Sequence, residues 1–325
     1  MSRGTPGAPV LLFVLRRVLG LAVTLLVTSF LIFGALYIAP GSPLSYLVGG
    51  RTVSPQAIAQ VKAEYHLDQP FLTRYLSWLA DVLHGRFGVS LVYKESVWSL
   101  ISPRLTGTLL LLGYASVLIV LAGVALGVIA GLSRRRTDSA LTALATVGLA
   151  TPSFVASTVL ITVFAVALPV FPVFGAGSGL TDRLWHLTLP AVALALSGCA
   201  YVARVTRTAV RQEATREHVE TARSRGLAEH LVIRRHVLRN ALAPIATVSG
   251  LTIAGLIAGT AVVETAFGLD GIGSLLVQSV SQKDFAVVQA ISLILVVGFV
   301  LVNTAMDLLY PLIDPRISLT SGATR

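Results

Sequence analysis

The chain alternates long apolar runs with short polar stretches. No charged residue occurs between Arg17 and Arg51, and comparable runs recur five more times. Each run reaches or exceeds the roughly 18 residues that a helix needs to cross the hydrocarbon of a bilayer. The predicted spans are residues 17–38, 105–132, 139–168, 185–205, 241–263 and 286–309. The pattern therefore predicts an all-α integral membrane protein with about six transmembrane helices.

Composition agrees with this prediction. Only 12% of the 325 residues are charged, against about 25% in soluble domains. The net charge of +10 does not indicate nucleic-acid binding, because the arginines form no basic domain with interleaved aromatics. They flank the apolar runs at 16–17, 134–136 and 204–239, whereas the loops 170–184 and 264–285 are nearly free of arginine and lysine. The positive-inside rule then places both termini in the cytoplasm of a bacterial inner membrane.

The spans divide the chain into five parts. The run after Arg16 and Arg17 is followed by no small-residue cleavage site, so we expect an uncleaved first helix. Residues 41–103 are too polar to span and are expected to form a helical extracytoplasmic insert. The predicted parts are 1–40 (N-terminal segment and first span), 41–103 (insert), 104–213 (spans 2 to 4), 214–240 (cytoplasmic loop) and 241–325 (spans 5 and 6 and the C-terminal tail).

Few residues offer chemistry of their own. No GxxxxGK[ST], HExxH or nucleophile–base spacing occurs, so we expect neither catalytic residues nor ATP binding in this chain. Cys199 is a lone cysteine in an apolar run, and the histidines show no tight ligand spacing, so no metal site is predicted. Glu264 and Asp307 lie near the ends of spans, where a solvated helix terminus is the favoured interpretation. A secondary transporter would carry mid-span charges or inverted repeats, and neither is clear.

The segment 217–244 is charged and helix-favouring, although it lies between two apolar spans. We expect a short helix over 214–225, a cap at Gly226 and a second helix over 227–238. Val219 and Ala222 share one face of the first helix. That face could enter a groove on a soluble partner, with Glu220 and Arg223 at its rim. A basic helix lying on anionic lipid is the alternative from physics alone.

The spacing Glu220-Thr221-Ala222-x3-Gly226 resembles the EAA loop of ABC importer permeases. Further motifs resemble the dipeptide, oligopeptide and nickel branch of that family, and its B-type subunit, in order along the whole chain. They are YHLDQP at 65–70 with Tyr75 and Trp78, GRFGVS at 85–90, RLTGTL at 104–109, TPSF at 151–154, VETAF at 263–267 and DPR at 314–316. Arg86 departs from the aspartate that is usual in the second of these motifs.

The resemblance implies the type I ABC importer permease fold, with an EAA loop that serves as a coupling helix. The residues expected to contact the ATP-binding subunit are Val219, Glu220, Thr221, Ala222, Arg223 and Gly226. The implied partners are a homologous second permease, two ATP-binding subunits or domains that hold ATP and Mg²⁺, and an extracytoplasmic substrate-binding protein. This chain itself would hold no cofactor. The implied function is peptide import by alternating access, with a nickel or glutathione importer as the alternative and a secondary transporter behind both.

Overall fold

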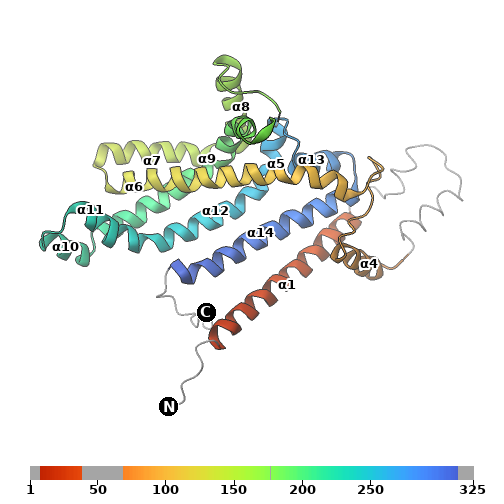
Figure 1. The fold of residues 1–325 in the computed structure, drawn as a ribbon, viewed down its shortest axis with the longest axis horizontal. Coiled ribbons are helices and arrows are strands. Elements are labelled where there is room, and N and C mark those ends of the chain that lie inside the picture. Colours follow the sequence, from red (N-terminus) through yellow and green to blue (C-terminus); the bar gives the residue numbers. More distant parts are fainter. Residues whose placement is uncertain (1–7, 39–68, 176, 314–325) are drawn as a thin grey trace, which may run out of the picture.

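The computed structural model describes residues 8–38, 69–175 and 177–313. Over these residues the chain is helical, and its only extended pairing is an isolated bridge between Val89 and Ser96. Figure 1 shows long helices running side by side along one axis, with shorter helices at the two ends. The all-α prediction is confirmed.

Five helices are long and apolar enough to cross a membrane, or six spans if a bent pair counts as one. Most of the predicted spans thus appear as continuous helical rods. The rods are α1 (Ala8–Ile38), α5 (Val97–Leu118) with η1 (Ile119–Gly123) and α6 (Val124–Leu132), α9 (Gly179–Ala214), α11 (Glu229–Val232) with η3 (Ile233–Leu238) and α12 (Arg239–Ala266), and α14 (Phe285–Ile313).

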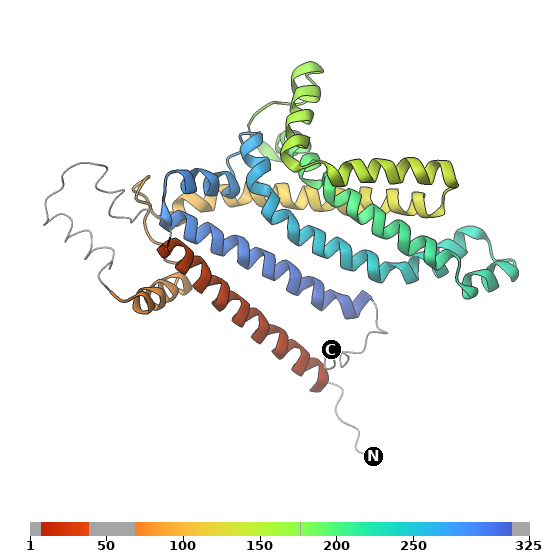
Figure 2. The ribbon, with the colours of Figure 1, turned by 180° about the vertical axis from the view of Figure 1, so that it is seen from behind.

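The third predicted span, 139–168, is not one straight helix. It consists of α7 (Arg135–Ala150) followed by α8 (Ser153–Leu160) and η2 (Ile161–Ala167), and the two halves meet at 105°. Pro152 explains the break: it has no N–H, and its ring forces the preceding residue out of the helical region. Thr151 accordingly has an extended backbone, with φ −87° and ψ 113°. In Figure 2 the α8 half projects away from the bundle.

Helix α9 lies at the centre of the bundle, and glycines let α6 approach it closely. A Cβ on Gly127 would come within 2.5 Å of the Thr206 Cβ and 2.6 Å of the Ala203 carbonyl oxygen. Gly123 and Gly131, one helical turn away on either side, face α9 in the same way. Small residues at four-residue spacing allow close helix packing in membranes, where van der Waals contact replaces the hydrophobic effect.

The two ends of the bundle carry different short helices. One end has α10 (Glu217–Ser224) and α11, together with the start of α1 and the end of α14 (Figures 1 and 2). The other has α4 (Phe71–Leu83) and α13 (Ile272–Ser281), beside the start of α5 and the start of α14. Helices α4 and α13 lie in the segments 41–103 and 264–285, which the sequence placed outside the spans. The rest of the predicted insert, residues 41–68, lies outside the described residues.

Helix α4 is held to α1 by aromatic side chains. Tyr75 is buried, its hydroxyl lies 2.9 Å from the Ser29 hydroxyl, and its ring packs edge-on against Phe30 and Phe33. Trp78 packs on Phe33, with 5.4 Å between ring centroids. The tyrosine and tryptophan of the motif around residues 65–78 therefore dock this helix onto the first span.

Candidate functional site

Helix α10 forms the tip of one end of the molecule. Its first turn carries Glu217 and Glu220 and its last turn Arg223, an arrangement that complements the helix dipole. Gly226 follows with φ +75°, a conformation that only glycine adopts readily. The Leu227 N–H donates to the Ala222 carbonyl and the Gly226 N–H to the Arg223 carbonyl, which is the Schellman arrangement. A helix with a glycine cap is confirmed, although it begins at Glu217 and the predicted start, Ala214, is the last residue of α9.

Val219 and Ala222 share a face, as expected, but this face points into the chain. Val219 is 0% exposed and Ala222 5%, and both pack in a cluster with Val210, Val232 and Val237. In this structure, the face that was expected to enter a partner's groove is covered by the chain itself. An apolar face covers the nearest apolar surface, and here α9 and η3 of the same chain supply it.

The outward face of α10 is polar. Glu220 and Thr221 are exposed, as are the neighbouring Glu217, Ser224 and Arg225. The predicted contact residues therefore fall into two groups. Val219 and Ala222 are buried and anchor α10, whereas Glu220 and Thr221 lie on its exposed surface. Only the exposed residues are available to another protein without rearrangement.

Arg223 faces back toward its own chain. Its Nη2 donates to Glu229 Oε1 at 2.8 Å, its Nε to Oε2 at 3.2 Å, and its Nη1 to the Ala214 carbonyl at 3.2 Å. These hydrogen bonds to Glu229 raise the pKa of Arg223 above its usual value. Arg223 thus joins the end of α9, helix α10 and the start of α11 into one rigid tip.

The predicted second helix over 227–238 is not a separate element. Helix α11, η3 and α12 follow one another without a break, and Glu229–Ala266 forms a single helical rod of 38 residues. At 1.5 Å per residue this rod is far longer than a bilayer core of about 30 Å. The tip of α10 therefore rests directly on a transmembrane helix, so a force on α10 would reach the membrane without crossing a hinge.

Two histidines meet beneath α10. The rings of His218 and His236 lie 6.2 Å apart, and His218 Nε2 is 3.2 Å from the Asn240 side-chain nitrogen and 3.4 Å from Glu213 Oε1. No group of three or more His, Cys, Asp and Glu side chains suited to a metal occurs in the described part of the chain.

A buried carboxylate with two arginine partners connects α7 to α9 near the same end. Asp138 accepts hydrogen bonds from Nε and Nη2 of Arg207 and from Nη1 of Arg211, the last at 2.6 Å. Two arginines of the positive-inside cluster are therefore engaged within the protein. Sequence reasoning missed this contact, because the acidic residue precedes its partners by about 70 positions.

The sequence suggested that Glu264, at the opposite end, lies at a solvated helix terminus. The structure shows that it is buried instead. It is 1% exposed and accepts hydrogen bonds from Thr108 Oγ1 at 2.6 Å, the Gly273 N–H at 2.8 Å and the Ser274 N–H at 3.0 Å. It thus caps the first turn of α13 and ties it to α5. A Cβ on Gly273 would come within 2.6 Å of the Ala261 Cα, which explains the glycine there. The side chain of Asp307 lies outside the described residues.

Two further polar contacts hold helices and loops together at the same end. Ser90 donates to the buried Asp284 at the start of α14, and Arg104 Nε lies 2.8 Å from Asp270 Oδ1. The RLTGTL motif therefore contacts the VETAF motif through Thr108, and GRFGVS contacts α14 through Ser90. Arg86, the departure from the family pattern, forms an exposed ion pair with Asp81 at 2.7 Å that closes the turn after α4.

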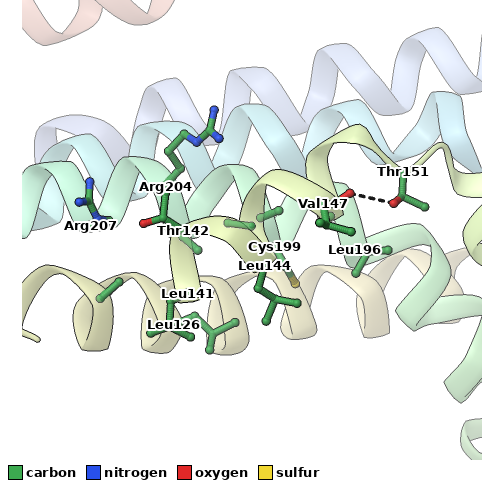
Figure 3. A pocket seen from close by; sticks show the side chains of 15 residues that line it. Leu126, Leu141, Thr142, Leu144, Val147, Thr151, Leu196, Cys199, Arg204 and Arg207 are labelled. Carbon is green, nitrogen blue, oxygen red and sulfur yellow. Dashed lines mark hydrogen bonds between the residues drawn. The ribbon is translucent and has the colours of Figure 1, made fainter. Parts of the chain in front are cut away.

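Two cavities lie on either side of the α7 bend. The first, about 210 Å³, is bounded by α6, α7 and α9 and is lined almost entirely by apolar side chains, with Arg204 and Arg207 at one end (Figure 3). The second, about 340 Å³, lies between the bend, α9 and α12, and is lined by hydroxyls and glycines as well as apolar side chains. Thr151 borders both, and its hydroxyl donates to the Val147 carbonyl at 2.8 Å, drawn as a dashed line in Figure 3.

Comparison with known proteins decides the family. Residues 123–319 match the family described as binding-protein-dependent transport system inner membrane component, and residues 10–112 match its N-terminal component. The chain belongs to this family. It is an ABC importer permease subunit and a multi-pass inner membrane protein, so the sequence prediction is confirmed at this level.

Relatives agree along nearly the whole length. The glutathione transport system permease protein GsiC of Salmonella choleraesuis is 36% identical over 306 residues, covering 94% of this chain and 98% of the relative. The oligopeptide transport system permease protein OppB of Escherichia coli is 36% identical over 307 residues with the same coverage.

Solved structures share the fold. A chain of the inward-facing MetNI methionine ABC transporter aligns with a TM-score of 0.54 and 17% identity, covering 66% of this permease and 96% of that chain. A chain of an amino acid ABC transporter with histidines aligns at 0.52 and 22% identity, covering 65% and 93%. At these identities the likeness shows the fold alone, and it confirms the expected permease architecture.

Proposed function

We propose that this permease receives short peptides from an extracytoplasmic binding protein and passes them to the cytoplasm by alternating access. The observation that carries the proposal is the rigid tip: α10 presents a polar outward face, and its apolar face is packed onto α9 and the rod ending in α12. Such a tip can be moved by a soluble partner and transmits the movement to the spans.

The energy comes from partner subunits. Two ATP-binding subunits or domains, with ATP and Mg²⁺, close on each other and draw two such tips together, one from this chain and one from a homologous second permease. The start of α1 and the end of α14 lie on the side of α10, and we propose that this side faces the cytoplasm. The binding protein docks at the opposite end, near α4, α13 and the insert.

The roles of the six predicted contact residues follow from their burial. Glu220 and Thr221 touch the ATP-binding subunit. Val219 and Ala222 anchor α10 to its own chain and act on the contact only indirectly. Arg223 and Gly226 fix the orientation of the tip, Arg223 through Glu229 and Gly226 through its left-handed backbone.

Glutathione is the second candidate substrate. The specific support is the relative named as a glutathione permease, which is as similar as the oligopeptide permease. Glutathione is itself a tripeptide, so the same set of hydrogen-bonding groups along the translocation path could bind both substrates. Membership of an ABC importer family argues against the secondary-transporter alternative.

The first test is purification of the chain from its native membrane in mild detergent, with mass spectrometry of its companions. We expect two P-loop subunits, a second permease and a binding protein. Recovery of this chain alone, under conditions that keep other membrane complexes intact, would overturn the proposal.

A pair of matched substitutions then tests the tip. Thr221→Trp enlarges an exposed position on α10 and should abolish retention of the ATP-binding subunits. Thr73→Trp makes the same change at an exposed position of α4, at the other end, and should retain them. Gly226→Trp should abolish transport while the chain still inserts, and normal uptake by that variant would argue against the coupling role.

A further inference from the structure

The cavity between the bend, α9 and α12 is unusual for a site in the middle of the membrane. Its lining includes the hydroxyl side chains Thr151, Ser153, Ser197 and Thr252, together with Gly255. Ser197 lies near the middle of α9 and Thr252 near the middle of α12. No lining residue is ionisable. The cavity therefore combines hydroxyls with apolar side chains such as Leu194 and Leu256, and it carries no charge.

The bend leaves backbone groups without partners at this depth. The helical ladder stops at the Thr151 N–H bond to Val147 and resumes at the Ala156 N–H bond to Pro152. Between them, the N–H groups of residues 153–155 donate to no described residue, and the carbonyls of residues 148–150 accept from none. Each such group would cost several kcal/mol if it faced lipid. Irregular backbone at membrane depth persists only where it is buried in protein or lines a water-filled cavity.

The side chains of the cavity also offer free hydrogen-bonding groups. The hydroxyls of Ser153 and Ser197 have no hydrogen-bond partner among the described residues, whereas Thr151 and Thr252 donate to helix carbonyls and can still accept. A Cβ built on Gly255 meets nothing within 4 Å, so this wall of the cavity is open. The cavity on the other side of α7 shares Thr151 and includes Thr142, but its surface is otherwise almost entirely apolar, which suits lipid or packing instead.

We propose that this hydroxyl-lined cleft is a solute-binding section of the translocation path. It would hold a passing solute through hydrogen bonds from serine hydroxyls and from the open backbone of the bend. Such a surface matches the amide groups of a peptide, and it cannot select by charge because it carries none. The inference rests on the proposed importer function and adds the location and chemistry of the path.

Thiol labelling tests whether the cleft is wet. In a Cys199→Ala background of the full complex in permeabilised native membranes, Ser153→Cys and Ser197→Cys should react with a charged methanethiosulfonate reagent. Leu121→Cys is the control, because Leu121 is an exposed apolar residue of η1 at a similar depth, where Ile119 contacts Gly198. Trialanine, used as the probe, should slow labelling of the two cleft cysteines several-fold.

Reaction of the cleft cysteines no faster than the Leu121→Cys control would overturn the wet cleft. Labelling that trialanine does not slow would overturn solute binding there. These readouts do not depend on transport, so they are independent of the importer proposal.

Filling the cleft tests the path itself. Gly255→Leu adds a side chain into open space within a regular helix, so the fold should survive while trialanine uptake falls at least tenfold. Gly20→Leu in α1 and Gly113→Leu in α5 are matched controls, since a Cβ at either position also meets nothing within 4 Å. Both should transport normally, and all three should retain the ATP-binding subunits.

The two proposals fail in different ways. If the wild-type complex does not import trialanine, peptide import is wrong and the labelling result still stands. If the wild type imports it and Gly255→Leu does so equally well, the cleft is not the path although the importer function holds.

Discussion

The two ends of this permease use glutamate in opposite ways. Glu220, in the motif at the α10 end, is exposed and lies on a polar face that no described residue of the chain covers. Glu264, in the motif at the other end, is buried and accepts three hydrogen bonds that bind α13 to α5. Both residues belong to short motifs of similar length and similar appearance in the sequence.

The difference separates two arrangements of a short motif, one that joins parts of the fold and one that leaves a polar surface free. At the α13 end, the motifs RLTGTL and VETAF contact each other, and GRFGVS contacts the start of α14. At the α10 end, the buried half of the motif faces its own chain and leaves the polar half free. We therefore expect substitutions at the α13 end to change stability, and those on the exposed face of α10 to change coupling.

The largest effect is expected at Glu264. Glu264→Ala leaves the Thr108 hydroxyl and the N–H groups of Gly273 and Ser274 buried without an acceptor, at roughly 1–3 kcal/mol for each donor. The variant should be nearly absent from the membrane, or melt far below the wild type when purified. Thermal unfolding in detergent and quantitative immunoblotting of membranes would measure this.

Two controls sharpen that result. Glu264→Gln keeps one acceptor oxygen and should recover part of the stability. Asp270→Ala removes an exposed carboxylate from the same loop and should cost little, since its pair with Arg104 is largely solvated. A stable Glu264→Ala permease that failed only in transport would mean that this end works by contact after all.

A smaller effect is expected from Val219. Val219→Ala removes two buried methyl groups and should cost about 2 kcal/mol, because the cluster around Val210 and Val237 would be left with a gap. Thr221→Ala, two residues away on the exposed face, should leave the melting temperature unchanged. Equal melting temperatures for the two variants would contradict the inward direction of the Val219 face.

The sequence was sufficient for the spans and insufficient for their contacts. Apolar runs and arginine clusters follow from bilayer thickness and charge placement, which are local properties of the chain. The Asp138–Arg207 and Thr108–Glu264 contacts join residues about 70 and 156 positions apart, and no local pattern encodes such pairs. The pairing of Val219 with Ala222 on one face was predictable from helical spacing, but its direction depended on which apolar surface lay nearby.

The bend illustrates the same limit. Pro152 was visible within the third predicted span, and a break or kink is what proline favours. The size of the bend, and the cleft it opens against α9 and α12, depend on Ser197, Thr252 and Gly255 from other helices. Chain position alone could not bring these residues together.

Gly226 should show a third, smaller effect. Gly226→Ala forces a Cβ into a backbone with φ +75° and should cost about 1 kcal/mol, although no neighbouring atom would clash. Gly226→Asn should cost less, because asparagine tolerates the left-handed region better. Thermal unfolding of the purified complex measures both, and an alanine variant as stable as the wild type would indicate that the tip adopts another backbone when assembled.

The smallest effect is expected from the Arg223–Glu229 pair. Both side chains are substantially exposed, so water and salt screen their attraction. Exchanging the two charges, with Arg223→Glu and Glu229→Arg together, should shift the melting temperature less than Glu264→Ala, Val219→Ala or Gly226→Ala, and less again at high salt. The exchanged pair cannot reproduce the donation from Arg223 to the Ala214 carbonyl, so the orientation of α10 should loosen. Coupling, measured as ATP hydrolysis stimulated by a loaded binding protein, should therefore fall while stability does not. If coupling also stayed unchanged, Arg223 would contribute nothing to the rigidity of the tip, and the contrast between the two ends would rest on Glu220 and Thr221 alone.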